Sequence, residues 1–132
     1  MGLTDDERKW VVQFRLEKAN SAFSEIAILT NNALWHTAAN RLYYACYYAA
    51  TALLIKNEYF SKSHEGTIGL FGQHFIKTNI IDPKHGATLS QTESLRKKGD
   101  YNDMFVIDPE NVKQLVVPTE EFIVTIEKLT FA

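Results

Sequence analysis

The segment AANRLYYACYYAATALLI, which runs from Ala38 to Ile55, is almost wholly apolar and aromatic, yet it contains one arginine, Arg41. At helical spacing, its alanines and leucines fall on one face and several of its tyrosines on another. A helix that is apolar on nearly all sides is buried on most of them. We therefore expect a helix from about Leu34 to Lys56 that lies at the centre of a bundle or between two subunits.

Amphipathic segments flank this central helix on both sides. Apolar residues recur every three or four positions from about residue 4 to residue 31, which predicts one long helix. After the central helix, Ser63 can cap a third helix, and the Asp-Pro pairs at 82–83 and 108–109 can start two more. The sequence thus predicts an all-α, up-and-down bundle of about five helices.

Two later residues are expected to shape the ends of these helices. Gly99 follows a basic turn of Arg96, Lys97 and Lys98, and it is the expected C-cap of the fourth helix. Pro118 is expected to start, kink or interrupt the last helix, because proline lacks the backbone N–H that a helix interior needs.

The length and composition restrict the class of protein. The chain has 132 residues, which predicts a single domain spanning residues 1–132. Its net charge of -2 supplies no general basic surface for nucleic acid, so any such contact has to be local. The single cysteine, Cys46, cannot form an internal disulfide, and the polar, acidic N-terminus does not resemble a signal peptide. We expect a cytoplasmic protein without a membrane segment.

Residue chemistry alone leaves two interpretations of Arg41. An unpaired buried charge is costly, so the guanidinium either pairs with a carboxylate or is presented to an anion. The candidate carboxylates are Glu25, Asp100 and Asp103. An ion pair would lock the bundle, whereas an anion site would mark a function, and both interpretations remain open.

Three motifs resemble those of a known family. They are AANRLYYACYYAATALL, SHEGTIGLFGQHFIKT and LRKKGDYND, and they occur in this order between residues 38 and 103. They resemble the compact, stand-alone prokaryotic branch of the HEPN superfamily, helical domains named for higher eukaryotes and prokaryotes nucleotide binding. The resemblance implies a helical bundle that forms a homodimer, in which the central helices of two subunits face each other across a groove.

The resemblance also suggests a chemistry. Many HEPN proteins are metal-independent ribonucleases, often toxins, whose motif is an arginine, four to six residues and a histidine. Arg41 matches this arginine, and Tyr48 stands at the histidine position after LYYACY. A histidine titrates near pH ~6.5 and suits general base catalysis, whereas a tyrosine titrates near pH ~10. Tyr48 is therefore expected to be a poor base, although a phenol can donate a hydrogen bond or stack on a nucleobase.

Together these arguments predict a HEPN binding and dimerisation module for RNA or a nucleotide, a component of a toxin–antitoxin type system in which catalysis is weakened or lost. The alternative is an active metal-independent endoribonuclease that uses Arg41 with a substitute base, either Tyr48 or His64. The expected catalytic residues are Arg41 and Tyr48, and the expected nucleotide- or RNA-binding residues are Asn40, Tyr44, His64, Arg96 and Asp100.

No metal ion or cofactor is expected. The histidines at positions 36, 64, 74 and 85 do not show the spacing of a zinc motif, and the single cysteine adds no ligand set. The expected partners are a second copy of the chain and RNA or a nucleotide. A minimal nucleotidyltransferase is a further expected partner, because some HEPN proteins accompany one in toxin–antitoxin pairs.

Overall fold

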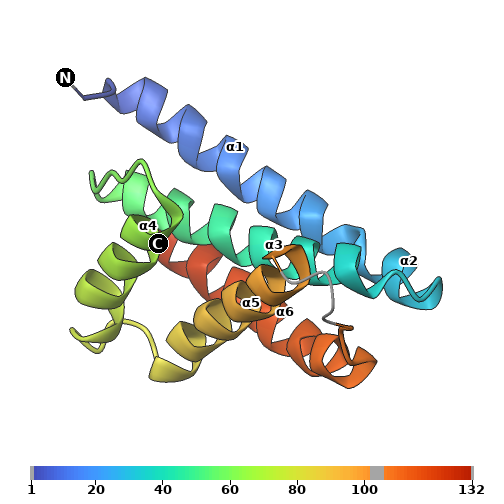
Figure 1. Cartoon of the computed structure of the whole chain (residues 1–132). Helices are drawn as coiled ribbons and strands as arrows, with labels where there is room; N and C mark the ends of the chain where they lie inside the picture. The colour runs from blue at the N-terminus through green and yellow to red at the C-terminus, as the bar shows by residue number, and fades with distance from the viewer. Residues whose placement is uncertain (1, 102–105, 132) are drawn as a thin grey trace.

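The computed structural model describes residues 2–101 and 106–131. These residues form six α-helices and one π-helical turn, and no strand occurs among them (Figure 1). The predicted all-α bundle of about five helices is confirmed, with α2 continuing α1 and η1 continuing α4. The elements are α1 (Asp5–Ser24), α2 (Ile26–Asn31), α3 (Trp35–Lys56), α4 (His64–Phe71), η1 (Gly72–Ile76), α5 (Pro83–Tyr101) and α6 (Pro109–Thr130).

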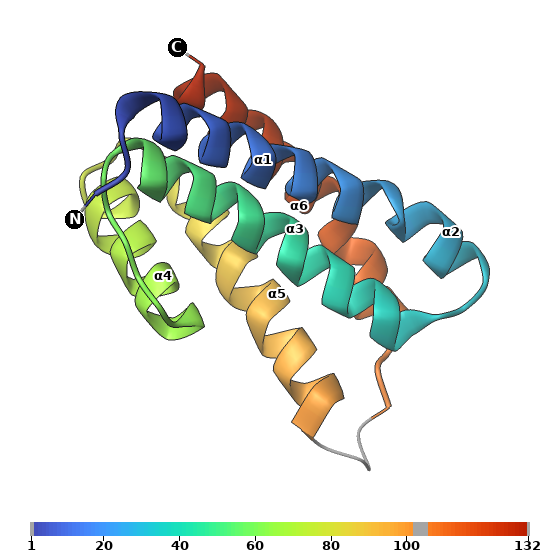
Figure 2. The ribbon, with the colours of Figure 1, turned by 90° about the horizontal axis from the view of Figure 1, so that it is seen from above.

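The apolar run of the sequence forms α3, which lies at the centre of the bundle and contacts each of the other α-helices. Figures 1 and 2 show α1 beside α3 and running in the opposite direction. In both views α5 lies on the side of α3 away from α1. The expectation of a helix buried on most sides is met within one chain.

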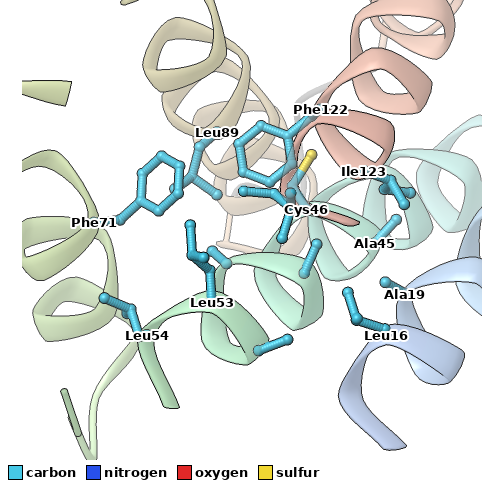
Figure 3. Close-up of a cluster of buried hydrophobic side chains, with 14 of the residues drawn as sticks. Leu16, Ala19, Ala45, Cys46, Leu53, Leu54, Phe71, Leu89, Phe122 and Ile123 are labelled. Atoms are coloured by element: carbon cyan, nitrogen blue, oxygen red, sulfur yellow. The ribbon is translucent and has the colours of Figure 1, made fainter. Parts of the chain in front are cut away.

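Small side chains let α3 pack closely against its neighbours. Ala45, Ala49 and Ala52 are fully buried, and helix axes approach most closely where the residues at the contact are small. The surrounding core is built from larger side chains of several helices (Figure 3). Among those drawn there are Leu16 and Ala19 of α1, Phe71 of α4, Leu89 of α5, and Phe122 and Ile123 of α6.

The predicted first helix is interrupted at Glu25, so the prediction of one continuous helix from residue 4 to residue 31 is wrong in this detail. The N–H of Glu25 donates to the carbonyl of Ala22 at 3.3 Å, a three-residue spacing that tightens the chain locally. α2 then continues to Asn31, and Ala33 takes a left-handed conformation with φ of 54° that ends the helical run.

The predicted N-caps of three helices are confirmed. Ser63, Asp82 and Asp108 each accept a hydrogen bond at 2.9 Å from a backbone N–H two or three residues later. Because the first N–H groups of a helix have no partner within it, these side chains fix where α4, α5 and α6 begin.

The expected C-cap at Gly99 is wrong, as are two of the three effects expected of Pro118, which neither starts nor interrupts the last helix. α5 continues to Tyr101, so Gly99 lies inside the helix rather than at its C-cap. A Cβ atom at Gly99 would lie 3.0 Å from Nδ1 of His36 and 3.1 Å from Cδ1 of Ile107, so glycine permits close packing there. Pro118 lies inside α6, which continues on both sides of it although proline removes one backbone hydrogen bond.

Candidate functional site

Arg41 lies in the first half of α3 and is half-buried. Its Nε and one terminal nitrogen both donate to the side-chain oxygen of Asn40, at 3.1 and 2.7 Å. Among the described residues the guanidinium forms no ion pair, so neither Glu25 nor Asp100 is its partner. Asp103 lies outside the described residues. The described contacts therefore hold the guanidinium by an amide oxygen and leave its positive charge in place.

Tyr44 lies one turn after Arg41 and brings two guanidinium groups to the same aromatic ring. Cζ of Arg41 lies 5.4 Å from the centroid of the Tyr44 ring, and Cζ of Arg96 lies 5.8 Å from it. Arg96 comes from α5, and its Cζ also lies 4.8 Å from the ring centroid of Tyr43. Cations are attracted to the faces of aromatic rings, so these tyrosines help to hold two permanent positive charges close together.

The start of α4 brings His64 to the same tyrosines. Ser63 caps the helix by accepting a hydrogen bond from the N–H of Gly66. A Cβ atom at Gly66 would lie 2.8 Å from Oγ of Ser63, so only glycine leaves this cap undisturbed. The SHEG motif therefore has a structural explanation, since the cap and the glycine fix the first turn. The ring of His64 consequently lies 5.8 Å from the ring of Tyr44, centroid to centroid.

Two further tyrosines of α3 hold the imidazole of His64. The imidazole stacks on Tyr47 at a centroid distance of 4.4 Å, and its Nδ1 lies 2.7 Å from the hydroxyl oxygen of Tyr43. Tyr43 is fully buried, and burial raises its pKa, so its hydroxyl stays protonated and needs an acceptor. Nδ1 of His64 is placed to be that acceptor, and in this tautomer the proton of the neutral imidazole is on Nε2.

The protonation of His64 follows from its surroundings. Burial, followed by the positive charge of Arg96, lowers the pKa of His64 below its ordinary value. The imidazole is therefore neutral at neutral pH. With Nδ1 bonded to Tyr43, the Nε2–H group is a hydrogen-bond donor suited to an anion. In the other tautomer Nδ1–H donates to Tyr43, and Nε2 is then able to accept a proton.

Charged side chains of α5 complete the electrostatics of the site. Asp100 pairs with Arg96 at 3.0 Å, while Lys97 lies 3.5 Å from Glu93 and 3.9 Å from Glu65 of α4. Nε of Arg96 is buried without a hydrogen-bond partner among the described residues, whereas the buried carboxylate oxygen of Glu93 faces the ammonium group of Lys97. Because buried polar atoms are nearly always satisfied, Nε of Arg96 is a donor available to a further group.

Tyr48 lies beside this group of side chains. Its ring lies 5.6 Å from that of Tyr44, and the ammonium group of Lys18 from α1 lies 4.8 Å from its centroid. Within the described part of the chain, the tyrosine over which Arg41 lies is Tyr44. Tyr44 thus contacts both Arg41 and Tyr48.

The structure brings together most of the predicted site residues. Those at positions 40, 41, 44, 64, 96 and 100 are linked by the contacts described above, whereas Tyr48 borders the group. Tyr43 and Tyr47, which contact His64, were not among the residues predicted from the sequence. We call the following side chains the Arg41 cluster: Asn40, Arg41, Tyr43, Tyr44, Tyr47, His64, Arg96 and Asp100.

Outside the Arg41 cluster, the described residues form a cavity but no metal-binding group. In residues 2–101 and 106–131, no three His, Cys, Asp or Glu side chains are placed to hold a metal ion. Every helix described is too short or too polar to cross a membrane. A cavity of about 630 Å³ between α5 and α6 is lined by residues such as His85 and Gln114, none of which belongs to the cluster.

The sequence of the chain matches the model of the HEPN domain family over residues 12–129. The chain belongs to the HEPN family. The resemblance carried by the motifs around Arg41 and His64 is thereby confirmed, since both residues lie inside the matched region.

Named relatives of this HEPN protein come from bacteria and archaea. It is 30% identical over 124 residues to a UPF0332 protein of Thermotoga maritima, with 94% of each chain covered. It is 31% identical over 117 residues to a Methanocaldococcus jannaschii protein named "Putative toxin MJ0605", with 89% of this chain and 87% of the relative covered. A UPF0332 protein of Gloeobacter violaceus is 37% identical over 86 residues, which cover 65% of this chain and 68% of the relative.

Proposed function

We propose that this HEPN protein is a binding and dimerisation module for RNA or a nucleotide, and a component of a toxin–antitoxin type system in which catalysis is weakened or lost. The observation that carries the proposal is the placement of two guanidinium groups and the His64 imidazole around the ring of Tyr44. Guanidinium groups match the geometry of phosphate oxygens, and tyrosine rings stack on nucleobases. The naming of the Methanocaldococcus jannaschii relative as a putative toxin supports the toxin–antitoxin part of the proposal.

Two observations support the proposal that catalysis is weakened or lost. The position of the motif histidine holds Tyr48, whose ring lies against Tyr44 and Lys18. His64 is the nearby imidazole, and we expect its Nδ1 to accept from the buried Tyr43 hydroxyl, which leaves the proton on its other nitrogen. In this arrangement the imidazole donates a hydrogen bond to a phosphate and does not remove a proton.

A metal-independent endoribonuclease is the second candidate, and the position of His64 favours it. The lowered pKa of His64 keeps the imidazole neutral at neutral pH, which a general base requires. In the alternative tautomer, Nε2 would accept the proton of the 2′-hydroxyl while Arg41 and Arg96 stabilise charge on the phosphoryl group. This candidate replaces the motif histidine with one from α4.

Cleavage of a labelled mixed-sequence RNA in the presence of EDTA separates the two candidates. The binding module predicts that the wild type leaves the RNA intact but binds it, and that Arg41→Ala weakens binding at least about tenfold, the typical cost of losing a charge-assisted hydrogen bond. Lys128→Ala removes an exposed cation of α6 and serves as the matched control. Cleavage that disappears in both Arg41→Ala and His64→Ala establishes the ribonuclease instead.

The Tyr48→His variant tests the proposed loss of catalysis directly. It restores the histidine of the motif, so a gain of cleavage in an otherwise inactive protein supports a HEPN site that has lost its base. RNA that neither binds to nor is cleaved by the wild type contradicts both candidates.

The partners and the setting are part of the same proposal. We expect one HEPN domain per chain, a homodimer, and association with a minimal nucleotidyltransferase in the cytoplasm. The lone Cys46 fits a reducing compartment. Light scattering of the purified protein and co-expression with a minimal nucleotidyltransferase measure both associations, and a monomer that captures no such partner contradicts them.

A further inference from the structure

An exposed pair of aromatic side chains lies on α1, outside the Arg41 cluster. Trp10 is 66% exposed and Phe14 is 42% exposed. Their rings are stacked, with centroids 5.3 Å apart and planes only 6° from parallel. These rings contribute little to the core, yet they present a flat apolar face to solvent.

A lysine connects this aromatic pair to α3. The ammonium group of Lys18 lies 5.4 Å from the ring centroid of Phe14 and 4.8 Å from that of Tyr48. Lys18 is exposed, whereas Tyr48 is half-buried. A positive charge therefore stands between an exposed ring of α1 and the tyrosines of α3.

The contacts continue from Tyr48 to the Arg41 cluster. The ring of Tyr48 lies 5.6 Å from that of Tyr44, over which the guanidinium of Arg41 lies. Figures 1 and 2 show that α1 and α3 run antiparallel, and Lys18 of α1 contacts Tyr48 of α3. Since Trp10 precedes Lys18 in α1, it lies beyond Tyr48 as seen from Arg41. The distance along α3 from Arg41 to Tyr48 is about 10 Å, and that along α1 from Lys18 to Trp10 is about 12 Å.

We infer that the side chains that lead from Trp10 to Tyr48 form a binding track for single-stranded RNA. In this track the Arg41 cluster holds one phosphate, and the exposed rings stack on neighbouring bases. The inference rests on the proposed function and extends it to an oligonucleotide several bases long. The track consists of Trp10, Phe14, Lys18 and Tyr48, and it ends at Tyr44 of the Arg41 cluster.

The chemistry of the track favours RNA over a protein partner. Every nucleobase has a flat face that stacks on an aromatic ring, whatever the sequence. A phosphate pairs with the Lys18 ammonium and leaves it in water, whereas an apolar protein surface would bury that charge without a partner. The track thus offers aromatic rings to bases and one cation to a phosphate of a single strand.

Affinity for ligands of two lengths tests the track. The first probe is a labelled 2′-O-methyl oligonucleotide of about twelve nucleotides, within the range that single-strand sites occupy, and the second is a dinucleotide. The double variant Trp10→Ala/Phe14→Ala should bind the oligonucleotide at least about tenfold more weakly, because stacking on each base contributes substantially to affinity. Its affinity for the dinucleotide should not change, since the Arg41 cluster is intact.

Ile80→Ala is the matched control, because Ile80 is 55% exposed and lies between η1 and α5, outside the track. Tryptophan emission gives a second readout. The chain has two tryptophans, so in Trp35→Phe the remaining indole is that of Trp10. The oligonucleotide should quench this emission, and the dinucleotide should not.

Each outcome decides the inference. Unchanged oligonucleotide affinity in the double variant, or no quenching of Trp10, overturns the track and leaves the proposed function standing. A wild type that binds neither probe overturns the proposed function together with the track. A double variant with altered oligomeric state and unchanged RNA affinity shows that the aromatic pair belongs to a protein interface, which also overturns the track.

Discussion

The two faces of α3 differ in what limits their side chains. On the core face, Ala45, Ala49 and Ala52 are fully buried, and the neighbouring helices limit their size. On the site face, Arg41 and Tyr44 are half-buried. Arg41 contacts Asn40 and Tyr44 of the same helix, and Tyr44 also contacts Arg96 of α5 and His64 of α4. One helix thus combines alanines that serve packing with large polar groups that are held in place but remain partly accessible.

This difference in burial predicts that stability and function are separable along α3. A well-packed interior leaves no room for an added methylene, whereas a half-buried guanidinium tolerates replacement. Substitutions at neighbouring positions of α3 should therefore differ greatly in their effects on folding.

The largest effect should come from Ala49→Leu on the core face. The added side chain has no space, so the free energy of unfolding should fall by about 1–3 kcal/mol, as overpacking of a core typically causes. Urea denaturation followed by circular dichroism measures this change. The matched control is Ala27→Leu on α2, where the residue is exposed and the change should stay within about 0.5 kcal/mol. Equal effects at the two positions would contradict close packing of the alanine face.

A smaller effect should follow from pH. Burial lowers the pKa of both His64, at the site, and His85, beside the cavity between α5 and α6. The unfolded chain therefore binds more protons below pH ~6.5, so the free energy of unfolding should fall as the pH drops through that range. Denaturation between about pH 5 and pH 8 measures the slope.

Two variants divide this pH dependence between the two regions. His64→Gln should remove the part that belongs to the site face, and His85→Gln the part that belongs to the other side of the bundle. Stability that rises on acidification, or a slope that neither variant reduces, would contradict the lowered pKa values.

The smallest effect on stability should come from Arg41→Met. The guanidinium is half-buried and bonded to its neighbour Asn40, so its loss should change the free energy of unfolding by no more than about 0.5 kcal/mol. Chemical denaturation measures the stability, and the RNA-binding assay measures the function in the same preparation. A loss of several kcal/mol would instead assign Arg41 to a structural ion pair.

The parts of the fold that depend on local sequence could be predicted. The caps at Ser63, Asp82 and Asp108 follow from residue type and position, and the central helix follows from its apolar run. The role of Gly99 could not be predicted, because it depends on His36 and on the segment before α6, which only the folded chain brings close.

In the candidate site, too, contacts within one helix could be predicted from the sequence, whereas contacts between helices could not. Arg41 and Tyr44 share one helix, so their proximity follows from helical spacing. The contact of His64 with Tyr43 and Tyr47 depends on how α4 packs against α3, and no spacing in the sequence encodes it. The repeated tyrosine pairs were a signal, but the sequence did not show that Tyr43, Tyr44 and Tyr47 would contact His64 of α4.

The burial of Cys46 provides a probe of how often the centre of the bundle opens. The thiol is fully buried and lies 3.8 Å from the hydroxyl of Thr119 on α6, and burial raises its pKa to about 12. The thiolate is the reactive form of a cysteine. While α3 and α6 stay packed, a disulfide reagent cannot reach Cys46, and the raised pKa keeps the side chain in its unreactive thiol form. The rate at which a disulfide reagent modifies Cys46 therefore reports how often the centre of the bundle opens. Substitutions far from α3 can be ranked by their effect on this rate.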